Sequence, residues 1–105
     1  MGATILVKEV TVEQYQDLLR EHPIFVNSHA LFRLSQAQRK LFKEQELIHI
    51  LKNQQPNLIG IQQNGRYAAF FKQKQGYMRI IFQLTPQGIE IGTFYNIEKL
   101  PTLTK

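Results

Sequence analysis

The first half of the chain carries apolar residues at helical spacing after one short alternating stretch. Alternation over residues 4–10 predicts a strand. Thr11 stands three residues before Gln14, which is the form of a capping box, so a helix is expected to start there and to end before Pro23. Two further helices are expected, one over residues 28–34 or 28–40 and one over residues 44–53.

The second half changes to the two-residue period of strands. Asn64-Gly65 lies between two apolar runs, and this pair favours a type I′ hairpin turn because both residues tolerate positive φ. Four strands are expected, over residues 58–61, 66–71, 77–85 and 89–95, the last with Ile89, Ile91, Thr93 and Tyr95 on one face. The order of elements predicts an α+β fold, with N-terminal helices packed on one face of a four-stranded antiparallel meander.

Length and composition restrict the classes of function. A chain of 105 residues, 43% hydrophobic and 20% charged, predicts a single folded domain over residues 1–105. It has no cysteine, no metal-ligand spacing among its histidines and no phosphate-binding glycine motif, so no metal or other cofactor is expected. No stretch is apolar enough to span a membrane and the start lacks a signal-peptide pattern, so a cytoplasmic protein with no membrane partner is expected.

The formal net charge of +5 is concentrated in the middle of the chain. Residues 29–82 hold nine lysines and arginines against two glutamates, whereas residues 1–28 hold two basic and four acidic residues, and residues 83–105 hold two of each. A basic excess in one region is the pattern expected for a polyanion partner, nucleic acid first. A basic surface that serves only solubility is the alternative.

His29 and Arg33 form the most informative pair in the sequence. Four residues apart, they would project from one face of a helix, about 5–6 Å apart at Cβ. An imidazole that moves a proton, beside a guanidinium that stabilises charge on phosphate, suits RNA cleavage by attack of the 2′-hydroxyl. A solvated helix face also produces this spacing.

The predicted sheet offers a second group of candidates. Arg79 alternates with Met78, Ile80 and Phe82, so it is expected to point to an open face, where it could bind phosphate. Tyr95 is expected to position the RNA backbone or a base. Further candidates for RNA contact, each with the alternative of a solvated or half-buried side chain, are Arg66, Lys72, Lys74 and Tyr77.

Several segments together resemble a family of small domains of unknown function. SHALFRL, the helix over residues 44–53, the NGRYAAFFK hairpin, and the YMRIIF and IGTFY strands are similar to domains with a His-Ala-x-x-Arg helix followed by a meander. That family is grouped with RelE-like toxins and tRNA-cleaving colicins in one metal-independent ribonuclease (BECR-like) fold. The resemblance covers residues 25–97, and residues 1–22 could be an accessory strand and helix.

This resemblance implies an endoribonuclease toxin or a relative of one. His29 and Arg33 match the helical motif, Arg79 matches the basic strand position, and Thr93 and Tyr95 match the polar end of the last strand.

The leading hypothesis is therefore a toxin-like endoribonuclease that cleaves RNA, such as tRNA or mRNA, through His29, Arg33, Arg79 and Tyr95. A toxic role would imply a cognate antitoxin protein that covers the basic face. One alternative is a non-catalytic nucleic-acid-binding module, whose affinity falls with salt while no strand is cut. A second is a protein-interaction or immunity-type domain with Phe25 and Phe32 in its interface.

Overall fold

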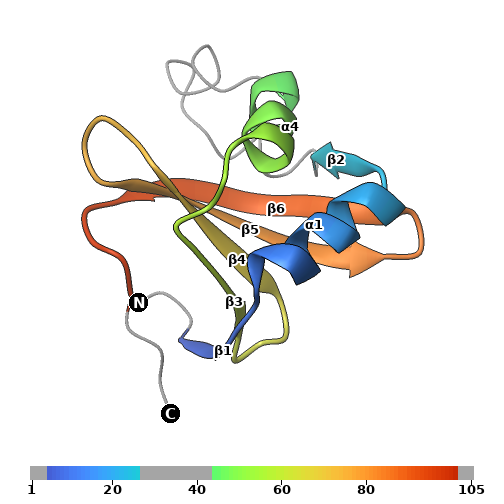
Figure 1. Ribbon diagram of the computed structural model, residues 1–105, viewed down its shortest axis with the longest axis horizontal. Coiled ribbons are helices and arrows are strands. Elements are labelled where there is room, and N and C mark those ends of the chain that lie inside the picture. Colours follow the sequence, from blue (N-terminus) through green and yellow to red (C-terminus); the bar gives the residue numbers. More distant parts are fainter. Residues whose placement is uncertain (1–4, 27–43, 102–105) are drawn as a thin grey trace.

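In residues 5–26 and 44–101, the part of the chain that the computed structural model describes, six strands form one mixed sheet and two helices pack against it (Figure 1). The strands lie in the order β1-β3-β4-β5-β6-β2. The bounds of the elements in chain order are β1 Leu6–Glu9, α1 Val12–Glu21, β2 Ile24–Val26, α4 Glu44–Asn53, β3 Leu58–Gln62, β4 Tyr67–Lys72, β5 Tyr77–Thr85 and β6 Gly88–Ile97.

The predicted fold, N-terminal helices on a four-stranded antiparallel meander, is wrong. β3, β4, β5 and β6 pair antiparallel in chain order. Two further strands extend the sheet: β1 pairs antiparallel with β3, and β2 pairs parallel with β6. β1 has four residues and β2 has three, and both pair with strands far along the chain. Alternation over residues 4–10 predicted the strand β1 but not its partner, whereas the three residues of β2 are too few to show a period. The helix predicted over residues 28–34 lies outside the described residues.

Predictions of single elements are confirmed where the sequence pattern is long or the capping motif is specific. The capping box of α1 is confirmed, because Thr11 Oγ1 accepts from the Gln14 backbone N and Gln14 Oε1 accepts from the Thr11 backbone N. The bounds predicted for α4 and β5 are confirmed as well.

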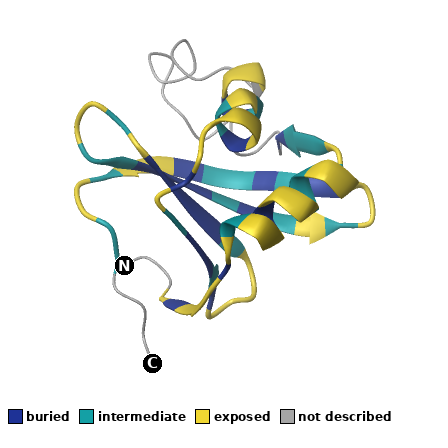
Figure 2. Cartoon of the chain, viewed as in Figure 1, coloured by how far each residue is buried: buried dark blue, intermediate teal, exposed yellow. Residues whose placement is uncertain are grey.

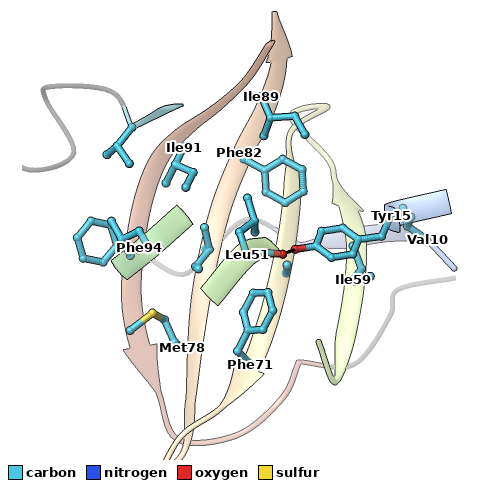
Figure 3. Packing of buried hydrophobic residues seen from close by; sticks show 14 residues of the cluster. Val10, Tyr15, Leu51, Ile59, Phe71, Met78, Phe82, Ile89, Ile91 and Phe94 are labelled. Carbon is cyan, nitrogen blue, oxygen red and sulfur yellow. Dashed lines mark hydrogen bonds between the residues drawn. The ribbon is translucent and has the colours of Figure 1, made fainter. Parts of the chain in front are cut away.

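The main hydrophobic core lies between the sheet and the two helices (Figures 2 and 3). Tyr15 of α1 and Leu47 and Leu51 of α4 are buried in it. The Tyr15 hydroxyl donates a hydrogen bond to the Leu51 carbonyl and so ties the two helices together (Figure 3). Both helices therefore cover the same side of the sheet, the helix face. The sheet residues of this core are Val26, Ile59, Ala69, Phe71, Met78, Ile80, Phe82, Ile89, Ile91 and Phe94.

The opposite side, the second face, carries a smaller apolar cluster. Leu6, Ala68 and Phe70 are buried there, and Leu58, Ile81, Ile97 and Leu100 pack around them half-buried. β4 is consequently buried on both faces, which explains its continuous apolar run of Tyr-Ala-Ala-Phe-Phe.

A β-bulge in β6 decides which of its residues face the helices. The pairing with β5 shifts register at Gly92, the extra residue. Ile89 and Ile91, before the bulge, belong to the main core, whereas Thr93 and Tyr95, after it, lie on the second face. The prediction that all four share one face is wrong, because one inserted residue reverses a two-residue alternation.

The β3–β4 hairpin also differs from its prediction. Gly65 has φ of 87°, and among the described residues only glycines have positive φ, so Asn64 lacks the conformation that a type I′ turn needs. Instead the Gly65 N donates to the Gln62 carbonyl at 2.9 Å, and the Gln62 N donates to the Arg66 carbonyl at 2.7 Å. This is the pattern of a three-residue loop whose glycine takes the left-handed conformation.

Candidate nucleic-acid interface

Five of the predicted site residues lie on the second face of the sheet. The register places Lys72 opposite Tyr77, Arg79 opposite Tyr95, and Thr93 opposite Ile81. The bulge in β6 turns Thr93 and Tyr95 to the same side as Arg79. The structure thus brings together residues of β4, β5 and β6 that the sequence left on separate strands.

Lysine and tyrosine side chains gather where β4 turns into β5. Lys72 Nζ lies 4.8 Å from the centroid of the Tyr77 ring, within the range of a cation–π interaction. Lys74 is exposed in the turn that follows β4. Tyr77 is half-buried and Tyr95 is 37% exposed, so both offer ring surface to a ligand.

Lys99 belongs to the same end of the sheet, although it is not among the site residues predicted from the sequence. Tyr77, the first residue of β5, pairs with Ile97, the last residue of β6. The exposed Lys99 follows two residues later. The predicted meander could have indicated Lys99, because two antiparallel neighbouring strands place the residues after the second strand beside the start of the first. We call Lys72, Lys74, Tyr77, Tyr95 and Lys99 the lysine end.

Arg79 lies on the predicted face but not in the predicted environment. Its side chain is 2% exposed, and its Nη2 donates a hydrogen bond of 2.5 Å to Gln62 Oε1. The guanidinium carbon lies 5.2 Å from the centroid of the Phe70 ring and 5.8 Å from that of Tyr95. The expectation of an open guanidinium is wrong, because two aromatic neighbours and an amide from β3 surround it. Alternation along a strand predicts the face to which a side chain points, but it does not predict whether neighbouring side chains on that face cover it.

The other predicted residues lie elsewhere. Arg66 is exposed at the β3–β4 hairpin, at the opposite end of β4 from Lys72, and its backbone N donates to Asn64 Oδ1 at 3.0 Å. Thr93 is half-buried between the two ends of β6. The predicted pair His29 and Arg33 lies outside the described residues, so its catalytic role stays a prediction.

The basic excess of the chain is carried by residues outside the described part. Residues 5–26 and 44–101 contain eight lysines and arginines and eight aspartates and glutamates, so they are formally neutral. The net charge of +5 therefore equals the charge of the other five basic residues, which are Arg33, Arg39, Lys40, Lys43 and Lys105.

A hollow of about 400 Å³ lies on the helix face, between α1 and the strands β1, β3 and β4. Apolar side chains line part of it, among them Tyr67, whose ring stacks on Phe82 with 5.1 Å between centroids. Lys8, Asp17 and Glu21 also line it. Two carboxylates against one lysine disfavour a polyanion, so the lysine end is the better candidate interface.

No group of three or more histidine, aspartate or glutamate side chains within residues 5–26 and 44–101 could hold a metal ion. Neither α1 nor α4, the helices of the described ranges, has the length and apolar character needed to cross a membrane. Comparison with protein-family models, with curated proteins and with solved structures gives no match.

Proposed function

We propose that this protein binds single-stranded RNA through the lysine end of the sheet. The observation that supports the proposal is that the exposed Lys72, Lys74 and Lys99 lie at one end of the sheet, with Lys72 over the ring of Tyr77. Lysine ammonium groups neutralise phosphates of any sequence, and tyrosine rings stack on unpaired bases. A surface with both features suits a flexible single strand better than a duplex, whose bases are already stacked.

Cleavage of the bound RNA is a second function, and it rests on His29 and Arg33. They stand four residues apart in the sequence, the spacing that lets a proton-moving imidazole act beside a charge-stabilising guanidinium. Attack of the 2′-hydroxyl on the adjacent phosphate then needs no metal. A toxin of this kind would be held inactive by an antitoxin protein, and the lysine end is the surface that such a partner would cover.

Fluorescence anisotropy with a short labelled oligouridine tests the binding proposal. We expect the wild-type protein to bind at low salt and the K72Q/K74Q variant to bind about tenfold more weakly, at about threefold for each lost phosphate contact. The matched control is K8Q/K52Q, which removes the same charge from exposed positions on β1 and α4. Equal losses in both variants would assign the binding to net charge and would reject the lysine end as the interface.

End-group analysis tests cleavage separately from binding. Total cellular RNA is incubated with the purified protein in EDTA, beside the His29→Ala and Arg33→Ala variants. Fragments that end in a 2′,3′-cyclic phosphate, absent with His29→Ala, are the result expected of the nuclease. Binding without fragments would favour the non-catalytic module.

A further inference from the structure

The second face contains a row of three side chains that places a buried cation behind an exposed ring. Phe70 of β4, Arg79 of β5 and Tyr95 of β6 stand opposite one another in the register. The guanidinium carbon of Arg79 lies within 6 Å of both ring centroids, at 5.2 Å from Phe70 and 5.8 Å from Tyr95. Arg79 is 2% exposed, whereas Tyr95 is 37% exposed. The cation is therefore inside and the ring is at the surface.

From this geometry we infer that Arg79 is a positioning residue for RNA binding, which fixes the ring of Tyr95 so that its exposed surface stacks on an unpaired base. The inference rests on the proposed function. It gives Arg79 a different role from the phosphate contact expected from the sequence, because a guanidinium enclosed by Phe70, Tyr95 and the Gln62 amide does not present its donors to solvent.

Fixing the Tyr95 ring before RNA binds is expected to increase the affinity for RNA. A tyrosine side chain that is free to rotate must be ordered when a base stacks on it, and this ordering lowers the affinity. The cation–π contact with Arg79, which the Gln62 Oε1 acceptor holds in place, restricts the Tyr95 ring in advance. Loss of the contact is expected to weaken RNA binding about three- to tenfold, the equivalent of ordering one such side chain.

Salt dependence separates this role from a phosphate contact. An arginine that touches phosphate contributes about 0.7 to the slope of log affinity against log salt on a single strand. A residue that acts through Tyr95 contributes nothing to that slope. Its effect also disappears with a probe that has no bases, and it disappears when Tyr95 is already removed.

The experiment compares wild type, Arg79→Met, Tyr95→Ala and the double variant, with oligouridine and with inorganic polyphosphate as the base-free probe. We expect Arg79→Met to lose about three- to tenfold in affinity for oligouridine, with an unchanged salt slope and unchanged affinity for polyphosphate. In the Tyr95→Ala background the same substitution should have no further effect. Arg79→Lys, which keeps the cation, should restore part of the affinity for oligouridine.

Gln62→Met provides a second variant in case Arg79→Met does not fold, because it removes the acceptor and leaves the arginine in place. It should show the same pattern with a smaller loss. Two results would overturn the positioning role while leaving RNA binding intact. One is a salt slope that Arg79→Met reduces by about 0.7, and the other is a loss of oligouridine affinity on Arg79→Met that is as large in the Tyr95→Ala background as in the wild type. Failure of the wild-type protein to bind oligouridine would instead reject the proposed function, and this inference with it.

Discussion

Tyr15 and Arg79 are each polar and buried, and each takes its position from a residue on a distant element. The Tyr15 hydroxyl of α1 bonds to the Leu51 carbonyl of α4, and the Arg79 side chain of β5 bonds to the Gln62 amide of β3. The sequence predicts that Tyr15 lies on the apolar stripe of its helix and that Arg79 lies opposite the core residues of its strand. It does not predict these bonds, because each one depends on how two elements pack.

Replacing Tyr15 with phenylalanine is expected to lower the free energy of unfolding by about 1–2 kcal/mol, because the buried Leu51 carbonyl loses its donor. Burial also raises the pKa of the Tyr15 hydroxyl above its ordinary value. The folded protein therefore keeps a proton that the unfolded chain releases near pH 10. Stability from this group is complete below about pH 10 and declines above it.

Urea unfolding of the wild type and of Tyr15→Phe, followed from neutral to alkaline pH, checks this prediction. The wild type should lose stability above about pH 10 more steeply than the variant, by up to about 1.4 kcal/mol per pH unit. Tyr95→Phe is the control, because it removes the hydroxyl of an exposed tyrosine. Parallel curves for the wild type and Tyr15→Phe would contradict the role given to burial.

At the scale of elements, length decides what the sequence predicts. β5 alternates over nine residues and α4 repeats over ten, and the predicted bounds of both are confirmed. β2 has three residues, and its partner β6 lies at the far end of the chain. The direction of Thr93 and Tyr95 depends on the one extra residue at Gly92. Pairing between distant segments is set by packing of the whole sheet, so local patterns do not contain it.

Gly88, the first residue of β6, lies close to Pro23, which precedes the parallel strand β2. Alanine at position 88 is expected to disrupt this close packing. The φ of Gly88 is 136°, and a Cβ there would lie 2.5 Å from the Pro23 carbonyl oxygen. The same oxygen accepts a hydrogen bond of 2.8 Å from the Ile89 N. The Gly88→Ala variant should lose about 1–3 kcal/mol of unfolding free energy through backbone strain, and more if the strands separate.

Urea unfolding of Gly88→Ala, with hydrogen exchange of the β2 amides, checks the effect. Gly92→Ala is the matched control, because a Cβ at that position meets no atom within 4 Å. The control should lose less than about 1 kcal/mol and keep the protection of β2. A Gly88→Ala protein with wild-type stability would show that β2 does not depend on this close approach.

At the scale of the whole molecule, the net charge is carried by residues outside the described part of the chain. The described residues are formally neutral, yet three of their five lysines, Lys72, Lys74 and Lys99, lie at one end of the sheet. The sequence predicted the basic middle region and Lys72, Lys74 and Tyr77 within it. It did not predict Lys99, nor the burial of Arg79, because the first depends on where β6 ends and the second on the neighbours across the sheet.

The salt dependence of RNA binding measures how much each part contributes. If oligouridine binds the lysine end, K72Q/K74Q/K99Q should lower the slope of log affinity against log salt by about 2, since each phosphate contact contributes about 0.7. R33Q/R39Q/K40Q/K43Q removes four of the five charges that make up the net charge, and a slope lowered by as much as about 3 would mean that the RNA also contacts these residues. A wild-type slope in the triple lysine variant, with a reduced slope in the quadruple variant, would assign the interface to Arg33, Arg39, Lys40 and Lys43 in place of the lysine end.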